Sequence, residues 1–137
     1  MITGIGVDIV QVNRIEHWLK NENLLKKYFG SEELSYTLSK GKKAAESLAA
    51  RFAAKEAFAK ALGTGLKNIA LKDINVCVNE NGKPDFKLFE TAQKALEKSG
   101  AQKIHLSLSH EKDNAIAMVV LETSPDQGGE VSPAEGS

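Results

Sequence analysis

One segment, residues 44–62, constrains the fold more than any other part of this 137-residue chain. It is rich in alanine and stops at Gly63, so it predicts a long α-helix closed by a glycine. Within it, Glu56 and Lys60 lie about one turn apart and share a face of the helix. This spacing is typical of an exposed ion pair that contributes about 0.2–0.5 kcal/mol, and equally of a carboxylate and a cation presented to a phosphate or a metal.

The N-terminal residues 2–10 alternate as a β-strand does, and one face of that strand carries Gly4, Gly6 and Asp8. Glycine inside a strand marks a place where a ligand or another backbone comes close. Asp8 is therefore a candidate functional acid, although an Asp near a strand end also caps turns. The two glycines are not a dinucleotide fingerprint, because that motif lies in a strand-to-helix loop and has a third glycine.

Weaker signals predict the remaining elements. Asn13 and Asn23 are expected to cap two short helices, and a third short helix is expected to start at Ser31. The later segments are expected to be a hairpin turning at Asn81-Gly82, a helix over 91–99, a strand over 104–110 and a strand over 115–121 that is buried on both faces. The chain is thus expected to be a single α+β domain, in which a mostly antiparallel sheet packs with one long helix and several short ones.

Composition excludes several classes of protein. The 18 basic and 18 acidic residues balance, so no nucleic-acid partner is expected. The single cysteine, Cys77, excludes an internal disulfide, fits a reducing cytosol and is expected to be a small packed residue. No leader and no membrane-crossing apolar run is present, so a soluble cytoplasmic protein without a membrane partner is expected. Residues 1–122 form the expected domain, and residues 123–137 lack the apolar surface to fold.

Two carboxylates from distant parts of the chain, Asp8 and Glu56, could converge as a hard-oxygen site for Mg²⁺, or could be unrelated surface acids. Zinc is not expected, because the cysteine and the histidines show no ligand spacing. His110 closes a strand and is either a ligand contact or a hydrogen-bonded core residue. Arg51 and Lys42 could bind phosphate or could be solvated, and the planar guanidinium makes Arg51 the better candidate.

Three ordered motifs closely resemble the holo-acyl-carrier-protein synthases, the small bacterial type of 4′-phosphopantetheinyl transferase. The resemblance is collinear from about residue 1 to residue 121, and three motifs in this order are far more specific than any one of them. The motifs are Gly4-Ile5-Gly6-Val7-Asp8-Ile9, Arg51-Phe52-Ala53-Ala54-Lys55-Glu56-Ala57-Phe58 with Lys60 and Gly63-Thr64-Gly65, and Leu106-Ser107-Leu108-Ser109-His110.

The resemblance implies an enzyme of fatty acid biosynthesis that transfers the 4′-phosphopantetheine arm of coenzyme A to a serine of apo acyl carrier protein, releasing adenosine 3′,5′-bisphosphate. It implies that Asp8 and Glu56 bind Mg²⁺, or Mn²⁺, and that Lys60 lies near the diphosphate. Glu56, or water held by the metal beside it, is the candidate base. The residues implied around the adenosine 3′-phosphate are Lys42, Arg51 and His110.

The resemblance also implies that Arg14 docks the carrier and that the protein is a homotrimer with active sites at subunit interfaces. An ideal helix agrees with shared sites, because Arg51 projects about 140° away from Glu56. Trp18 and Leu19 could add apolar anchors for the carrier or could face the core. One departure from the family is Glu111, an acid beside the expected 3′-phosphate pocket that would repel the phosphate unless it turns away.

Two other functions remain compatible with these residues. The first is a catalytically silent module that binds coenzyme A or a carrier protein on the same scaffold. The second is a metal-dependent hydrolase of diphosphate substrates, because Mg²⁺ and carboxylates serve that chemistry equally well.

Overall fold

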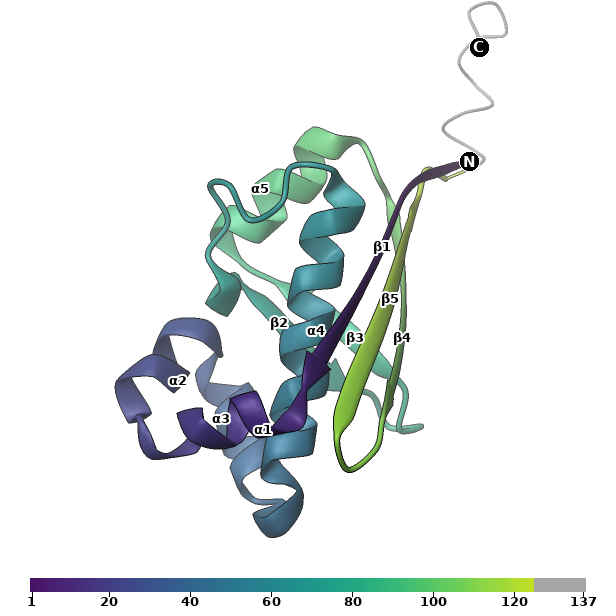
Figure 1. Cartoon of the computed structure of the whole chain (residues 1–137). Coiled ribbons are helices and arrows are strands. Elements are labelled where there is room, and N and C mark those ends of the chain that lie inside the picture. The colour runs from purple at the N-terminus through teal and green to yellow at the C-terminus, as the bar shows by residue number, and fades with distance from the viewer. Residues whose placement is uncertain (125–137) are drawn as a thin grey trace, which may run out of the picture.

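Two antiparallel sheets pack around a single long helix, α4 (Ala44–Leu62), in the computed structural model, which describes residues 1–124 (Figure 1). The larger sheet has the strand order β1-β5-β4, and the smaller is the hairpin β2-β3. The strands are β1 (Ile2–Gln11), β2 (Ile74–Val78), β3 (Pro84–Leu88), β4 (Lys103–His110) and β5 (Asn114–Glu122). The expected α+β class with antiparallel strands in a single domain is confirmed.

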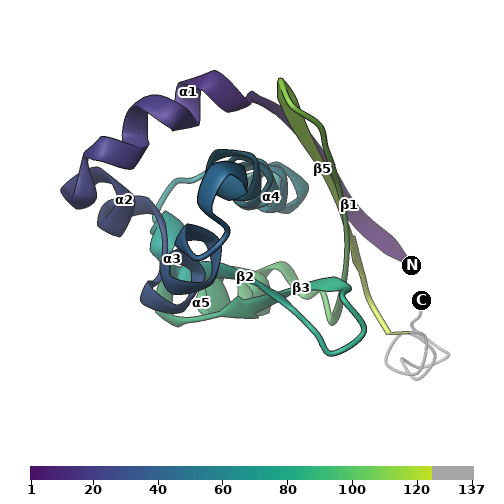
Figure 2. The same ribbon diagram turned by 90° about the horizontal axis from the view of Figure 1, so that it is seen from below.

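The shorter helices complete the enclosure of α4. Viewed from below, α4 lies in the middle, with β1 and β5 on one side, α1 and α2 on another, and α3, α5 and the hairpin on the remaining side (Figure 2). These helices are α1 (Val12–Glu16), α2 (Glu22–Tyr28), α3 (Ser31–Leu38) and α5 (Glu90–Ser99), and short 3₁₀ turns occur at His17–Lys20, Gly41–Lys43 and Leu71–Asp73. Among residues 1–124, no helix is both long enough and apolar enough to span a membrane.

Helix α4 is buried on almost every side, and its alanines allow this. Small side chains such as Ala53 and Ala57, both fully buried, let a strand or helix approach the α4 backbone closely. The helix ends at Gly63, whose left-handed backbone (φ +82°) and N–H bond to the Lys60 carbonyl form a glycine C-cap. The bounds and the glycine stop expected from the sequence are confirmed.

The two glycines of β1 are the places where the strand meets α4. A Cβ atom on Gly4 would collide with the carbonyl oxygen of Ala61, and one on Gly6 would collide with that of Ala57. The neighbouring backbone, and not a ligand, therefore occupies the space next to these glycines. This close approach presses β1 onto the helix and brings Asp8, two residues after Gly6, level with its C-terminal half.

Two expected helix caps are wrong. Strand β1 continues to Gln11 and passes directly into α1, so Asn13 lies inside the first turn of that helix and does not cap it. The next helix, α2, is capped by Asn21, whose Oδ1 accepts the Leu24 N–H at 3.1 Å, and not by Asn23. Asn21 has the extended backbone that an N-cap requires, whereas Asn23 is already helical.

Two burial expectations are also wrong. Cys77 is exposed on β2, because the buried part of that strand ends at Val76. Strand β5 buries only alternate residues, and its outer face leaves Ile116 and Met118 exposed. The expected tail over 123–137 lies outside the described residues from 125 onward, while Thr123 still donates its backbone N–H to the Met1 carbonyl at 2.9 Å.

Candidate active site

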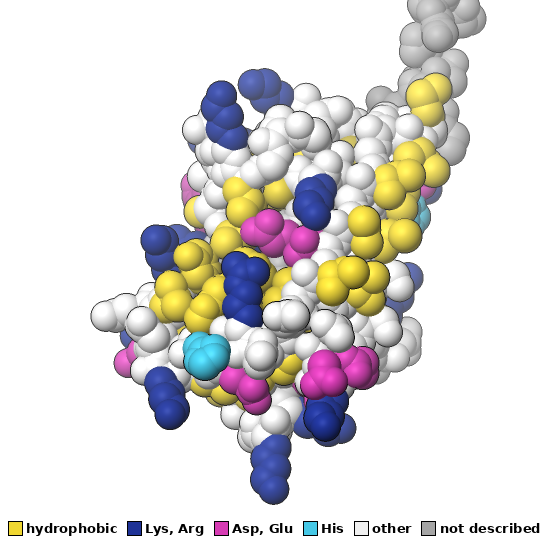
Figure 3. Space-filling view, in the orientation of Figure 1, with side chains coloured by type: hydrophobic (Ala, Val, Ile, Leu, Met, Phe, Trp, Pro, Cys, Tyr) yellow, Lys and Arg dark blue, Asp and Glu magenta, His cyan; other side chains and the backbone are white. Residues whose placement is uncertain are grey.

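Asp8 and Lys60 meet where β1 crosses the C-terminal half of α4. Lys60 Nζ lies 3.0 Å from Asp8 Oδ1 and also donates to the Val7 carbonyl at 3.0 Å. The Asp8 side chain is 17 % exposed and the Lys60 side chain 53 % exposed, so the pair is open to a ligand from one side. On the face shown in Figure 3, acidic side chains lie at the centre with basic side chains above and below them.

Glu56 is one turn before Lys60 on α4 and shares this site. Partial burial, and then the negative charge of Asp8, raise the pKa of the Glu56 carboxyl, while Lys60 and Arg14 act in the opposite direction. Two carboxylates close enough to repel each other beside an ammonium group form a site that a cation stabilises. The structure therefore brings together Asp8, Glu56 and Lys60, as the sequence predicted.

The carboxylate pair fits Mg²⁺ better than a metal held by protein ligands alone. Within residues 1–124, no group of three or more His, Cys, Asp or Glu side chains is arranged to hold a metal ion. Mg²⁺ at phosphate-processing sites typically binds one or two carboxylates and takes its other ligands from water and substrate phosphates. Asp8 and Glu56 supply that number of hard oxygen donors.

Arg14 extends the site toward α1. Its guanidinium lies over the Phe52 ring at 5.3 Å and the Trp18 ring at 5.6 Å, and its charge acts on Glu56. Trp18 packs against Tyr28 and Phe52, with ring centroids 5.2 and 5.1 Å apart. Trp18 is thus mainly a packing residue that supports Arg14, and Leu19 likewise packs against the core.

The residues expected at the 3′-phosphate lie at the other end of α4. Arg51 is only 5 % exposed, donates to Ser47 Oγ at 2.7 Å and lies 5.1 Å from the Tyr36 ring. Burial lowers the pKa of Arg51, and the charge of Glu33 partly offsets this. Its buried Nε has no hydrogen-bond partner in the described part of the chain.

His110 and Lys42 do not join Arg51 directly. His110 Nδ1 lies 2.9 Å from Glu46 Oε1, a partner on α4 that sequence reasoning missed, and Lys42 is exposed in the turn that precedes α4. The Glu111 carboxylate accepts the backbone N–H groups of Asp113 and Asn114 at 2.9 and 2.6 Å. It is therefore engaged within its own β4–β5 turn.

A buried ion pair behind the site was also missed. Lys55 donates to Glu33 Oε1 at 2.7 Å, to the Leu71 carbonyl at 3.1 Å and to the Ile74 carbonyl, so all three of its protons are used. Glu33 in turn accepts the N–H groups of Gly30 and Val76. The signal in the sequence was a lysine among alanines on a helix that the alanines predict to be buried, one turn after Arg51.

Comparison with known proteins shows the family to which the chain belongs. The family model of the 4′-phosphopantetheinyl transferase superfamily matches residues 4–119. The chain is 57 % identical over 122 residues to the holo-acyl-carrier-protein synthase of Treponema denticola, covering 89 % of this chain and 99 % of the relative.

Solved structures show the same similarity. The crystal structure of the synthase from Neisseria meningitidis is 40 % identical, with a TM-score of 0.82 and coverage of 90 % of this chain and 100 % of that one. A Bacillus anthracis synthase in complex with CoA (3′,5′-ADP) is 39 % identical, with a TM-score of 0.76 over 90 % and 99 % of the two chains. The chain therefore belongs to the 4′-phosphopantetheinyl transferase superfamily and, within it, to the holo-acyl-carrier-protein synthases.

Proposed function

We propose that this protein carries out the Mg²⁺-dependent transfer of 4′-phosphopantetheine from coenzyme A to a serine of apo acyl carrier protein, releasing adenosine 3′,5′-bisphosphate. The observation that carries the proposal is the convergence of Asp8, Glu56 and Lys60, with the pKa of Glu56 raised by burial and by Asp8. The transferase relatives and the coenzyme A complex of the Bacillus anthracis relative support the choice of substrates.

Each residue of this site has a role that its chemistry suits. Asp8 and Glu56 would hold Mg²⁺, or Mn²⁺, which when bound neutralises charge on the diphosphate. Lys60, which can exchange its contact with Asp8 for a phosphate oxygen, would stabilise the same charge. Glu56, or water held beside it, would accept the proton of the serine hydroxyl.

The serine oxygen forms a bond to the phosphorus that bears pantetheine, while the bond from that phosphorus to the bridging diphosphate oxygen breaks. The leaving fragment carries that oxygen away as the 5′-phosphate of adenosine 3′,5′-bisphosphate. The serine proton would pass to Glu56 or to water beside it, and it must be released before the next turnover.

We propose that Arg51, His110 and Lys42 bind the adenosine 3′-phosphate of a coenzyme A molecule whose diphosphate lies on another subunit. The proposal is supported by three basic side chains toward the N-terminal end of α4, because Lys42 lies in the turn before the helix and His110 contacts Glu46 in its first turn. Arg51 turns toward Tyr36 and α3, away from Asp8, so one subunit does not present both groups to a single ligand.

A homotrimer would supply the second subunit, and the outer face of the large sheet supports it. This face is apolar and open, with Ile5 and Ile9 59 % and 64 % exposed. The other exposed apolar side chains on it are Val7, Ile116 and Met118. A contiguous exposed apolar face of this kind marks a protein–protein interface. In Figure 3, hydrophobic side chains gather along the edge where β1 runs.

We propose that Arg14 docks the acyl carrier protein. The guanidinium is exposed, held over two rings, and close enough to Glu56 to act on its charge. A carrier bound there would present its serine beside the carboxylates, and its acidic surface would complement Arg14.

The decisive experiment is to incubate the protein with coenzyme A, Mg²⁺ and apo acyl carrier protein and to measure the intact mass of the carrier. Gain of one phosphopantetheine is the expected result. Hydrolysed coenzyme A beside an unchanged carrier would indicate a diphosphate hydrolase, and no change in either would indicate a silent binding module. Omission of Mg²⁺ should abolish the gain.

Shared sites have their own test. Glu56→Gln and His110→Ala proteins, each weakened alone, are mixed under conditions that allow subunits to exchange. Recovery of activity is expected, because some interfaces then combine an intact Glu56 with an intact His110. His110 is preferable to the buried Arg51, since its exposed side chain can be removed without disturbing the core. No recovery after demonstrated exchange would contradict shared sites.

A further inference from the structure

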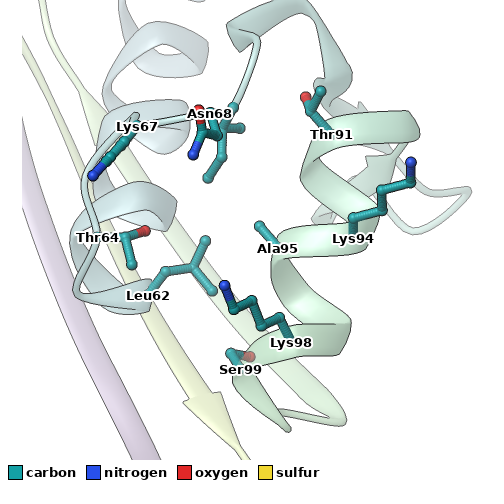
Figure 4. Close-up of a pocket in the computed structure, with 10 residues that line it drawn as sticks. Leu62, Thr64, Lys67, Asn68, Thr91, Lys94, Ala95, Lys98 and Ser99 are labelled. Carbon is teal, nitrogen blue, oxygen red and sulfur yellow. The ribbon is translucent and has the colours of Figure 1, made fainter.

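A cleft between the end of α4 and helix α5 is lined by none of the side chains to which a role in the transfer is assigned above. Its volume is about 600 Å³, within the range of about 300–1,000 Å³ that small-molecule sites occupy. Leu62 from α4 and Ala95 from α5 point into it from opposite sides (Figure 4), and Ile69 from the intervening loop also lines it. The floor of the cleft is therefore apolar.

The cleft lies on the opposite side of α4 from the proposed active site. Leu62 follows Lys60 by two residues, or about 200° around the helix, so the two side chains point in nearly opposite directions. Lys60 contacts Asp8 on β1, whereas Leu62 faces α5. A ligand in the cleft would not occupy the site at Asp8.

The charge at this cleft has one sign. Three lysines line it, Lys67, Lys94 and Lys98, and no Asp or Glu does, although the chain as a whole is neutral. None of the three lysines forms a salt bridge within residues 1–124. Figure 4 shows the Lys98 ammonium extending across the opening toward Leu62, while Lys67 and Lys94 lie on the rim and point outward.

The hydroxyl groups around the cleft are already engaged. Thr91 Oγ1 donates to Asp73 and accepts the Ala70 N–H, and Ser99 Oγ donates to the Leu96 carbonyl at 2.6 Å. The remaining polar groups that line the cleft are the Asn68 amide and the three ammonium groups, of which that of Lys98 extends across the opening. A cationic donor over an apolar floor is complementary to a molecule with an anionic head and a hydrocarbon chain.

We propose that this cleft binds an amphiphilic anion, with a short alkyl chain against Leu62, Ile69 and Ala95 and a carboxylate or phosphate head at Lys98. Lys67 and Lys94 add to the positive potential at the opening. The site is separate from the proposed transfer site, so its occupation does not depend on the transfer mechanism. Failure of one proposal therefore leaves the other standing.

The test uses isothermal titration of the full chain with decanoate and with decyl phosphate, both below the concentrations at which they form micelles. Two comparison probes separate the contributions. Inorganic phosphate is an anion without an alkyl chain, and decyltrimethylammonium has the same alkyl chain with a positively charged head. We expect saturable 1:1 binding of at least one anionic amphiphile and none of the comparison probes. Which of the two binds more tightly identifies a carboxylate or a phosphate head.

Variants locate the site. Lys98→Glu should weaken binding at least 10-fold, and Ala95→Glu, which places an acid against the floor, should do the same if Lys98→Glu fails to fold. Lys112→Glu makes the same charge change in the β4–β5 turn at the far end of the molecule and should leave binding unchanged. Lys98→Glu and Ala95→Glu should both retain carrier modification without the amphiphile.

Three results would overturn the proposal. They are no saturable binding of either anionic amphiphile, equal binding of decyltrimethylammonium, and binding that Lys98→Glu and Ala95→Glu leave intact. Magnetisation transfer from the alkyl protons of the probe to the methyl groups of Leu62 and Ala95 would support it directly, and transfer only to methyl groups of the outer sheet face would refute it.

Discussion

Two lysine–carboxylate pairs, five residues apart on the same helix, have opposite environments. Lys55 and Glu33 are 0 % and 1 % exposed, and every polar atom they present has a partner. Lys60 and Asp8 are 53 % and 17 % exposed and join one another beside a second carboxylate, Glu56. The first pair links α4 to α3 and β2, whereas the second is free to exchange its partners for a ligand.

An ion pair between a lysine and a carboxylate does not by itself show whether the pair stabilises the fold or takes part in binding. A buried pair costs desolvation free energy to form, but removal of one partner leaves the other charge buried without a partner. An exposed pair contributes about 0–1 kcal/mol, so evolution can use it for binding without loss of the fold. Here the buried pair serves the fold and the exposed pair serves the proposed chemistry.

The largest expected effect is on stability, from breaking the buried pair. Lys55→Ala leaves Glu33 charged and buried, and it should lower the free energy of unfolding by about 3–5 kcal/mol. Lys60→Ala should lower it by less than about 1 kcal/mol. Urea denaturation of both variants measures the difference in the free energy of unfolding. Similar losses of stability in the two variants would show that the buried pair does not stabilise the fold more than the exposed pair does.

A double variant sharpens this prediction. Glu33→Gln combined with Lys55→Met removes both buried charges, and the new amide can still accept the Val76 N–H. The double variant should be more stable than Lys55→Met alone, and the cycle with the two single variants Lys55→Met and Glu33→Gln should give a coupling of about 0.5–3 kcal/mol. If the double variant loses more stability than the two single variants lose in sum, Lys55 and Glu33 do not stabilise each other as an ion pair.

The next effect is on catalysis, from removing a carboxylate at the exposed pair. Asp8→Asn should lower kcat/KM for carrier modification by about 10²–10³-fold, equivalent to about 3–4 kcal/mol, with the free energy of unfolding nearly unchanged. Initial rates from carrier mass spectrometry give the first quantity and urea denaturation the second. Asp113→Asn, in the exposed β4–β5 turn, is the matched control and should retain activity.

A smaller effect tests how β1 is held against the helix. Gly6→Ala places a Cβ against the Ala57 carbonyl, which should cost about 1–3 kcal/mol of stability and shift Asp8 away from Glu56, so activity should fall as well. Gly41→Ala meets no atom within 4 Å but has φ +60°, so it should show backbone strain alone. If Gly41→Ala lowers activity and Gly6→Ala does not, the close approach at Gly6 does not position Asp8.

The smallest expected effect is the pH dependence of stability. Because the pKa of Glu56 is raised in the folded state, that state binds the proton more tightly than the unfolded chain does. The contribution of Glu56 to stability is therefore present below the pKa of the unfolded chain and lost as pH rises through the folded value. Glu56→Gln should raise Tm relative to wild type more at pH 7 than at pH 4, without metal or coenzyme A. A difference that is constant with pH would show that Glu56 does not titrate in this way.

The sequence anticipated helix α4 and the three residues that it and β1 bring together. Alanine content and Gly63 set the helix bounds, and the fixed spacing of Glu56 and Lys60 placed both on one face. The caps of the short helices were missed, because Asn21 and Asn23 are chemically the same and only the backbone angle distinguishes them. Strand β5 was expected to be buried on both faces, since an exposed apolar face has the same composition as a core face until its neighbours are known.

By itself, the sequence determined the long helix, the antiparallel strands and the family, because these follow from local periodicity and from ordered motifs. The tertiary structure alone decided which charges are buried, that the glycines of β1 admit a helix backbone, and that Glu111 is engaged within its own turn. Burial and partner choice depend on residues that are distant in the chain, and no local pattern encodes which of them will meet. For this reason Lys55 and Lys60 look alike in the sequence and differ in everything that matters to stability and chemistry.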